Sequence, residues 1–400
     1  MTWNKLQTLC LFLVASVSIA DAKPVKKSQT VKVQDMQWIA DQHVLGVQKE
    51  KGHATYIPYA TTADLKADER YQHAWKMPQK AMTLNLNGTW KFKWTAGTPQ
   101  GPRPTEWQSP TLDDSKWDDI RVPMNWEMTG RYNRPTYVNT SYPFKNEPPY
   151  AREGFVEHGV GDHNAVGFYR RTFDLPADWN GKRVFIHFDG VYSAATVYVN
   201  GVFAGYSQGA NNDAEFDITS QVRPGKNQLS VRVFRWSDGS YLEGQDIWHM
   251  SGIHRDVYLV AVPKTFVRDH RITVNNQSAD GTDGQLQVDL DIDNRSGLSA
   301  TKTYRLQLTD ANDKVVAQAE QQVKISAAQT QVTLTTDALS TLTPWNADQP
   351  YLYNVIISQL EKGREEMVFS TKYGFRNIQT VNNGDVHHFT INGKRVFFKG

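Results

Sequence analysis

The chain has 400 residues, with 44 basic and 42 acidic side chains and a formal net charge of +2 at pH 7. Because the opposite charges nearly cancel, the composition provides no basic field for nucleic acid and no acidic tail, and we expect no polyanionic partner. This length exceeds what one hydrophobic core normally supports, so two or three domains are expected.

The first 22 residues have the pattern of a secretory signal peptide. Lys5 precedes an apolar run from Leu9 to Ile19, and Ala20-Asp21-Ala22 forms a small-x-small cleavage site. A membrane anchor would need roughly 18 or more apolar residues, and the run is shorter than that. We therefore expect cleavage near Ala22 and a periplasmic or extracellular mature chain that does not span the membrane. Cys10, the only cysteine, would be lost with this segment, leaving no disulfide, thiol nucleophile or Cys-ligated metal.

Residues 23–83 are polar and show no clear periodicity, which favours an extended N-terminal arm. From about residue 84 to 262, short rows alternate apolar and polar side chains, and turn pairs follow them at close intervals. This pattern is typical of an antiparallel jelly roll. The rows include Val184, Ile186, Phe188, Leu229, Val231 and Val233, and the turn pairs are Asp189-Gly190, Asn200-Gly201, Pro224-Gly225 and Asp238-Gly239.

A second set of alternating strands predicts an immunoglobulin-like β-sandwich over residues 263–373. Its apolar positions include Leu286, Val288, Leu290, Ile292, Tyr304, Leu306 and Leu308. The chain is thus expected to be mostly β, without long amphipathic helices. After it, Asn392-Gly393 is a hairpin signal, and the run from Phe389 to Phe398 has no evident partner before Gly400. We expect this partner further downstream, in a longer protein.

Motifs for nucleotide binding and zinc proteolysis are absent from the sequence, which has no phosphate loop, dinucleotide fingerprint or HExxH. The segment 235–253 instead gathers three acids, Asp238, Glu243 and Asp246, while Asn139 and Gln208 lie in other loops. Such oxygen ligands suit sodium, magnesium or calcium, or the hydroxyls of a sugar.

Two of the three acids also have simpler explanations, and the third differs from them. Taken singly, Asp238 fits a plain turn and Glu243 a solvated loop charge. Asp246 precedes the bulky pair Ile247-Trp248, so we expect it to be buried and to need a cation or hydrogen-bond donors.

The order and spacing of several stretches over residues 35–400 resemble the N-terminal half of a secreted, lactase-type β-galactosidase of glycoside hydrolase family 2. The segment 235–253 is more similar to the β-galactosidase branch than to the glucuronidase or mannosidase branches. Other matching stretches are Leu86-Asn87-Gly88-Thr89-Trp90, Val122-Pro123-Met124-Asn125-Trp126, Tyr137-Val138-Asn139-Thr140-Ser141, Gly205-Tyr206-Ser207-Gln208 and Tyr373-Gly374-Phe375-Arg376.

The resemblance implies a jelly-roll sugar-binding domain, an immunoglobulin-like domain and a (β/α)8 barrel that begins at residue 374 and is incomplete at 400. In that family two barrel glutamates perform retaining hydrolysis. Both would lie beyond Gly400, so no catalytic residue is expected within this chain, and the 400 residues alone should be inactive.

The resemblance also assigns roles to four residues of this chain. Asp246 matches a sodium ligand that binds galactosyl hydroxyls directly or through the ion, and Asn139 matches a residue of the galactose subsite. Asp238 and Gln208 match ligands of a divalent cation, Mg²⁺ or Ca²⁺.

The implied activity is removal of terminal non-reducing β-D-galactose from β-galactoside oligosaccharides or glycans. A secreted carbohydrate-binding module without hydrolytic activity is the alternative. A structural adhesion domain would explain the fold but not the segment from Asp238 to Trp248. A homo-oligomer of the full-length parent is compatible with the resemblance.

Overall fold

The computed structural model describes residues 33–96, 104–151, 164–384 and 386–398. The expected signal peptide and Cys10 lie outside these residues. Within the described part strands dominate, which confirms the mostly-β prediction. The α-helices are short, namely α1 (Asp35–Trp38), α2 (Thr62–Ala67), α3 (Glu69–Gln72) and α4 (Ser240–Glu243). No helix of the described part is long and apolar enough to cross a membrane.

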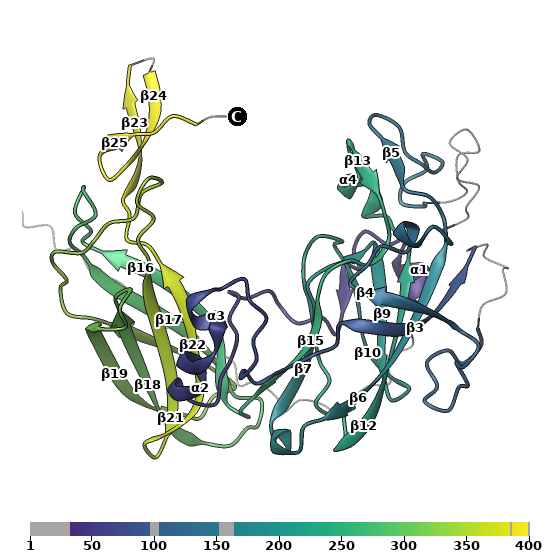
Figure 1. The fold of residues 1–400 in the computed structure, drawn as a ribbon, viewed down its shortest axis with the longest axis horizontal. Helices are drawn as coiled ribbons and strands as arrows, with labels where there is room; N and C mark the ends of the chain where they lie inside the picture. Colours follow the sequence, from purple (N-terminus) through teal and green to yellow (C-terminus); the bar gives the residue numbers. More distant parts are fainter. Residues whose placement is uncertain (1–32, 97–103, 152–163, 385, 399–400) are drawn as a thin grey trace, which may run out of the picture. The chain divides into compact units, whose positions relative to one another are not determined.

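Two antiparallel sheets form the first sandwich (Figure 1). The larger sheet has the order β1 (Gly46–Val47), β10 (Val202–Gln208), β9 (Ala194–Val199), β12 (Gly225–Phe234), β6 (Val166–Leu175), β3 (Gly88–Thr95) and β4 (Asp118–Val122). The smaller sheet has the order β11 (Ala214–Asp217), β7 (Arg183–Phe188), β15 (Val257–Val262) and β2 (Thr83–Asn85). The predicted apolar rows Ile186, Phe188, Leu229, Val231 and Val233 are buried in the core that the two sheets share, as alternation of strand side chains requires.

The second sandwich also has two antiparallel sheets. One has the order β16 (Phe266–Asn275), β17 (Gln285–Asp293) and β20 (Gln329–Thr335), and the other β19 (Val315–Ile325), β18 (Ala300–Thr309), β21 (Tyr353–Glu361) and β22 (Arg364–Tyr373). The predicted inward positions Leu286, Val288, Leu290, Ile292, Tyr304, Leu306 and Leu308 are all buried.

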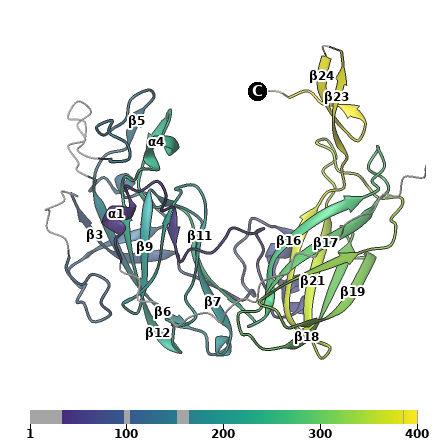
Figure 2. The same ribbon diagram turned by 180° about the vertical axis from the view of Figure 1, so that it is seen from behind.

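Two small ribbons and two 3-10 turns complete the first sandwich. The ribbon of β5 (Thr136–Val138) and β13 (Ile247–His249) projects from one end of the sandwich together with α4 (Figures 1 and 2). The second ribbon pairs β8 (Val191–Tyr192) with β14 (Gly252–Ile253), and the 3-10 turns are η1 (Trp126–Thr129) and η3 (Ala177–Trp179).

The N-terminal arm is more regular than the extended stretch that the sequence predicts. The side chain of Thr61 accepts a hydrogen bond from the backbone N–H of Asp64, and that of Asp68 from Arg70, so α2 and α3 both have N-caps. The arm is also tied to the sheets. Buried Asp35 pairs with Arg232 and accepts a 2.7 Å hydrogen bond from the Thr196 hydroxyl.

The last described residues form a three-stranded antiparallel sheet of β23 (Ile378–Asn383), β24 (Val386–Ile391) and β25 (Lys394–Arg395). Asn392 (φ 52°) and Gly393 (φ 74°) are both left-handed, as the predicted tight hairpin turn needs. Phe389 lies opposite Thr380 of β23, so the prediction that this run finds its partner only downstream is wrong. This sheet does not show the start of the expected barrel.

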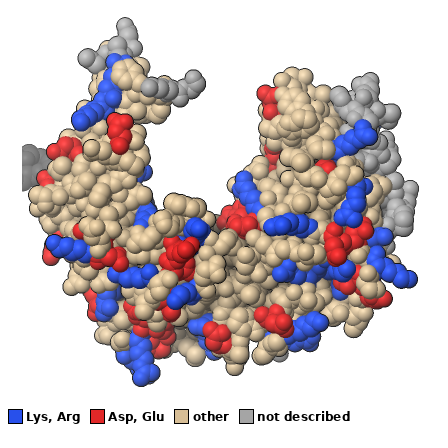
Figure 3. Space-filling model, in the orientation of Figure 1, with Lys and Arg blue, Asp and Glu red and all other residues tan. Residues whose placement is uncertain are grey.

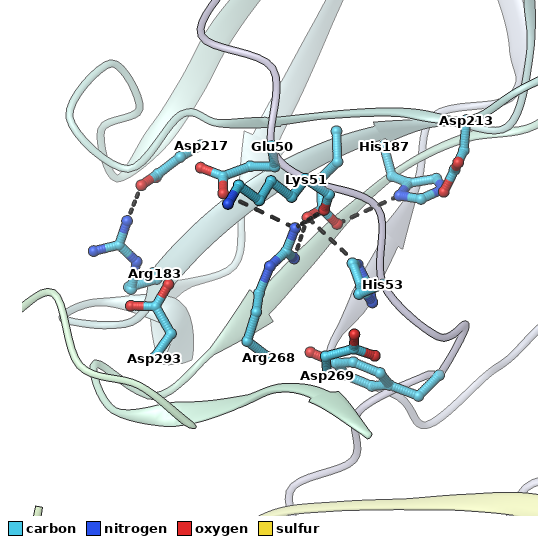
Figure 4. A network of polar contacts seen from close by, with 12 residues as sticks. Glu50, Lys51, His53, Arg183, His187, Asp213, Asp217, Arg268, Asp269 and Asp293 are labelled. Carbon is cyan, nitrogen blue, oxygen red and sulfur yellow. Dashed lines mark hydrogen bonds and ion pairs between the residues drawn. The ribbon is translucent and has the colours of Figure 1, made fainter. Parts of the chain in front are cut away.

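A network of buried charges joins the arm and both sandwiches (Figure 4). The Glu215 carboxylate on β11 contacts Arg268 of β16, His53 of the arm at 3.6 Å and His187 of β7 at 3.4 Å. Burial alone would raise the pKa of Glu215, but its hydrogen bonds to the two histidines and the charge of Arg268 hold this pKa well below its usual range. Arg268 also donates to the backbone oxygen of Lys51 at 2.7 Å.

Outside that network the surface charge is mixed. Lys and Arg side chains alternate with Asp and Glu side chains over the face seen in Figure 3. This face has no extended patch of positive charge of the kind that binds nucleic acid.

Candidate functional site

The segment after β12 folds around buried groups before it reaches the ribbon. Arg235 and Trp236 are fully buried, with the guanidinium carbon 4.9 Å from the ring centroid. The segment then turns through α4, where Gly244 packs against the buried ring of His249. A Cβ at Gly244 would lie 2.0 Å from Cε1 of His249, so only glycine fits there.

The ribbon of β5 and β13 brings together two residues that lie more than a hundred positions apart. Val138 pairs with Ile247, which places Asn139 and Asp246 at the same end of the ribbon. Tyr137 lies between them, because its hydroxyl donates to Oδ1 of Asp246 and the Asn139 side chain lies near enough to affect the pKa of Tyr137. The bond to the Asp246 carboxylate raises the pKa of Tyr137, and the Asn139 contact partly offsets this shift.

Asp246 is exposed, so the prediction that it is buried is wrong. Its bulky neighbours do not cover it, since Ile247 and Trp248 are themselves 40% and 57% exposed. The reason is that, among the residues that the structure describes, β13 pairs only with β5 in a two-stranded ribbon and does not belong to either sheet of the sandwich. Tyr137 is 49% exposed, and its ring centroid lies 5.6 Å from that of Trp248. The ribbon thus presents a carboxylate, an amide and two aromatic rings to solvent.

Gln208 and Asp238 meet at a second cluster, next to the arm. The Gln208 side-chain amide donates to the backbone oxygen of Trp38 at 2.9 Å. The backbone N–H of Asp238 donates to the backbone oxygen of Ile39 at 2.8 Å. Asp41 of the arm lies near enough to raise the pKa of Asp238. Sequence reasoning missed this contribution of the arm, because no local pattern indicates a contact across almost 200 residues.

Four oxygen atoms of this second cluster are buried and have no hydrogen-bond partner in the described part of the chain. They are Oε1 of Gln208, Oγ of Ser237, Oδ1 of Asp238 and Oε2 of Glu243. Three of these side chains surround one point. An ideal Cβ on Gly239 would lie 3.4 Å from both the Gln208 and Ser237 oxygens and 3.6 Å from Cδ of Glu243.

The electrostatics of the cluster fit a hard cation. Burial raises the pKa of Asp238, and the nearby Asp41 carboxylate raises it further. Burial likewise raises the pKa of Glu243, and the Asp238 carboxylate adds to that shift. Over the described residues no group of three or more His, Cys, Asp or Glu side chains is arranged to hold a metal. Amide and hydroxyl oxygens make up half of the four orphaned atoms, however, and Mg²⁺ and Ca²⁺ accept such ligands. The unsatisfied oxygens are therefore suited to an oxygen-coordinated ion.

Comparison with known families defines the class of this chain. Residues 83–263 match the description "Glycosyl hydrolases family 2, sugar binding domain", and residues 265–376 match "Glycosyl hydrolases family 2". The chain belongs to glycosyl hydrolase family 2, in agreement with the resemblance seen in its sequence.

The curated relatives of the chain include enzymes of one activity within this family. The chain is 35% identical over 373 residues to a beta-galactosidase of Priestia megaterium, an alignment covering 91% of this chain and 34% of the relative. It is also 35% identical over 371 residues to a beta-galactosidase of Halalkalibacterium halodurans, covering 92% of this chain and 33% of the relative. The chain thus spans about a third of the length of the curated relatives it matches.

Solved structures support the fold. A glycosyl hydrolase family 2 member from Bacteroides cellulosilyticus aligns with a TM-score of 0.60 and 25% identity, covering 78% of this chain and 37% of that one. A beta-glucuronidase of the same family aligns with a TM-score of 0.62 and 23% identity, covering 79% and 32%.

Proposed function

We propose that this chain is the N-terminal part of a β-galactosidase that hydrolyses terminal non-reducing β-D-galactose residues with retention, and that the ribbon of β5 and β13 forms part of the galactose subsite. The observation that carries the proposal is the meeting of Asn139, Tyr137 and Asp246 at the exposed end of this ribbon, in a chain with 35% identity to beta-galactosidases.

The chemistry of the ribbon suits recognition of one sugar epimer. A carboxylate makes charge-assisted hydrogen bonds to hydroxyl groups, and an amide both donates and accepts. A site built to hydrogen-bond a particular hydroxyl rejects an analogue that lacks it, because the site's polar groups then stay unpaired. The exposed rings of Tyr137 and Trp248 add apolar faces against which a sugar ring packs.

Retaining hydrolysis needs two carboxyl groups roughly 5 Å apart, one as acid and one as nucleophile. At the end of the ribbon the carboxylate is that of Asp246, and it already accepts a hydrogen bond from the Tyr137 hydroxyl. We infer that both catalytic glutamates come from a region outside these 400 residues, and that the chain alone binds galactosides without cleaving them.

Cations belong to the same proposal. The orphaned oxygens around Gln208 and Asp238 would hold Mg²⁺ or Ca²⁺, which would neutralise the crowded carboxylates and fasten the arm to the sandwich. Asp246 would contribute one ligand to Na⁺, which supplies a positive charge for galactosyl hydroxyls. Secretion after cleavage near Ala22 completes the proposal.

A chromogenic β-galactoside tests the proposed activity. We expect the product of the reading frame continued past Gly400 to hydrolyse it in the presence of sodium and magnesium, and the 400-residue chain to be inactive. Galactose binding by the short chain with no hydrolysis by the longer product would favour the carbohydrate-binding module instead.

A further inference from the structure

A groove with a volume of about 650 Å³ lies in the first sandwich, away from the ribbon. The starts of β3, β4 and β12 and the middle of β6 line it together with connecting segments. Its lining includes Thr89, Lys91, Arg170, Arg171, Arg223 and Lys226. None of Asn139, Gln208, Asp238 and Asp246 borders it, so it is distinct from the sites described above.

Two of the cations in the groove already have carboxylate partners. Lys91 pairs with Asp119 at 2.9 Å, and the buried Arg170 pairs with Asp114 at 2.7 Å. These pairs are locally neutral, so they form a polar wall with little net attraction for charge.

The other three cations have no carboxylate partner within the described ranges. Arg171 donates through Nη1 to the backbone oxygen of Thr89 at 3.3 Å, while its Nε is buried and has no hydrogen-bond partner there. Arg223 and Lys226 are exposed, and the nearest acceptor of Arg223 is the backbone oxygen of Lys226 at 3.3 Å. The lining holds five cations and two carboxylates, and Asp174 lies directly opposite Lys226 in the pairing of β6 with β12. The groove region therefore carries an excess of positive charge, although the whole chain is nearly neutral.

The loop that carries Arg223 and Lys226 is held in place by two asparagines. The amide of buried Asn227 donates to the backbone oxygens of Arg223 at 2.8 Å and Gly225 at 2.7 Å, and its Oδ1 accepts from the Arg223 N–H at 3.0 Å. Asn200 in turn donates to Oδ1 of Asn227 at 2.8 Å. A loop fixed in this way loses little conformational entropy when a ligand binds.

We propose that this groove binds an anionic saccharide, a sugar that bears a carboxylate or a sulfate ester. Its volume is in the range of small-molecule sites, roughly 300–1,000 Å³, and far exceeds an inorganic anion. The exposed hydroxyls of Thr89 and Thr172 provide hydrogen-bonding groups for sugar hydroxyls, and Pro110 and Leu112 provide an apolar edge. Arg223 and Lys226, three residues apart where β12 begins, recognise the acidic substituent through charge-assisted hydrogen bonds. The inference is independent of the proposed hydrolysis.

Calorimetric titration of the 400-residue chain with galactose 6-sulfate, galacturonate, galactose and inorganic sulfate tests this proposal. We expect the two acidic sugars to bind, with an affinity that falls as salt is added. The double variant Arg223→Ala/Lys226→Ala should weaken this binding by about tenfold or more. Both side chains are exposed, so the variant should fold normally. The matched control Arg271→Ala/Lys324→Ala removes two exposed charges from the second sandwich and should leave binding unchanged.

Three results would overturn the proposal. The acidic sugars fail to bind, or they bind the Arg223→Ala/Lys226→Ala variant as tightly as the unaltered chain, or inorganic sulfate binds as tightly as the sugars. If galactose 6-sulfate binds more tightly than galacturonate, the ligand of the groove bears a sulfate ester; the opposite order of affinity indicates a carboxylate.

Discussion

The contact between Gly244 and His249 sets the path of the segment that leads to Asp246. We predict that Gly244→Ala destabilises the chain by about 1–3 kcal/mol, because the new methyl group overlaps the buried imidazole. Urea denaturation measures the change. Gly52→Ala is the matched control, since a Cβ there meets nothing within 4 Å. Equal stability of the Gly244→Ala chain and the unaltered chain would show that the ring moves aside freely.

The carboxylates of Asp238 and Glu243 predict cation binding that depends on pH. Both have a raised pKa, so in the absence of a cation their ionisation costs stability as pH rises above the ordinary carboxyl range. Protons compete with the cation for these oxygens. Ca²⁺ or Mg²⁺ should therefore raise the melting temperature more at pH 7 than at pH 5, with a stabilisation of about 2.7 kcal/mol at one hundred times Kd.

Asp238→Asn should abolish this stabilisation by cations. Asp348→Asn, a change at an exposed acid of the second sandwich, should retain it. A melting temperature that does not change with either cation at any pH would show that the cluster around Gln208 and Asp238 does not bind a cation.

At the scale of elements, the charge network that joins β7, β11 and β16 to the arm predicts alkaline sensitivity. Burial lowers the pKa of His187, but its hydrogen bonds to Asp189 and Glu215 raise it overall to about 9, from an ordinary value of 6.5. Its stabilising charge is fully present below pH 6.5 and is lost as pH rises through 9, a loss of about 3 kcal/mol at most.

The measurement is the free energy of unfolding at pH 6.5 and pH 9.5 for the unaltered chain and for His187→Asn. The asparagine variant should lose most of the difference between the two pH values. An equally steep pH dependence in the variant would assign the loss to other groups.

Elements that follow a simple periodicity could be predicted from the sequence. Leu229, Val231 and Val233 alternate and are buried, and Asn392-Gly393 forms the turn that its composition indicates. The exposure of Asp246 could not be predicted, because bulky neighbours indicate burial only where a second layer covers the strand. The contribution of Asp41 to the Asp238 cluster depends on a tertiary contact and leaves no local signal. The cap at Thr61 could have been found from the Thr-x-x-Asp pattern before α2, and the cap at Asp68 from the preference of Asp for the N-cap position.

At the scale of the whole molecule, the described residues form a scaffold that holds the two proposed recognition sites in separate places. The ribbon carries Asn139 and Asp246, and the groove carries Arg223 and Lys226. The two carboxylates of the groove, Asp114 and Asp119, are already paired with Arg170 and Lys91, so neither site offers a free acid and nucleophile for retaining hydrolysis. The chain spans about a third of its curated relatives' length, and under the proposed function it positions substrate for catalytic groups outside these 400 residues.

The most direct test of the ribbon's role is kcat/KM for a chromogenic β-galactoside, measured with the product of the reading frame continued past Gly400. Asp246→Asn keeps the size of the side chain but removes its charge, and should lower kcat/KM by about tenfold to a hundredfold while weakening the response to sodium. Asp348→Asn should leave kcat/KM unchanged. A kcat/KM for Asp246→Asn equal to that of the unaltered protein, with the same sodium response, would contradict a galactose subsite on this ribbon.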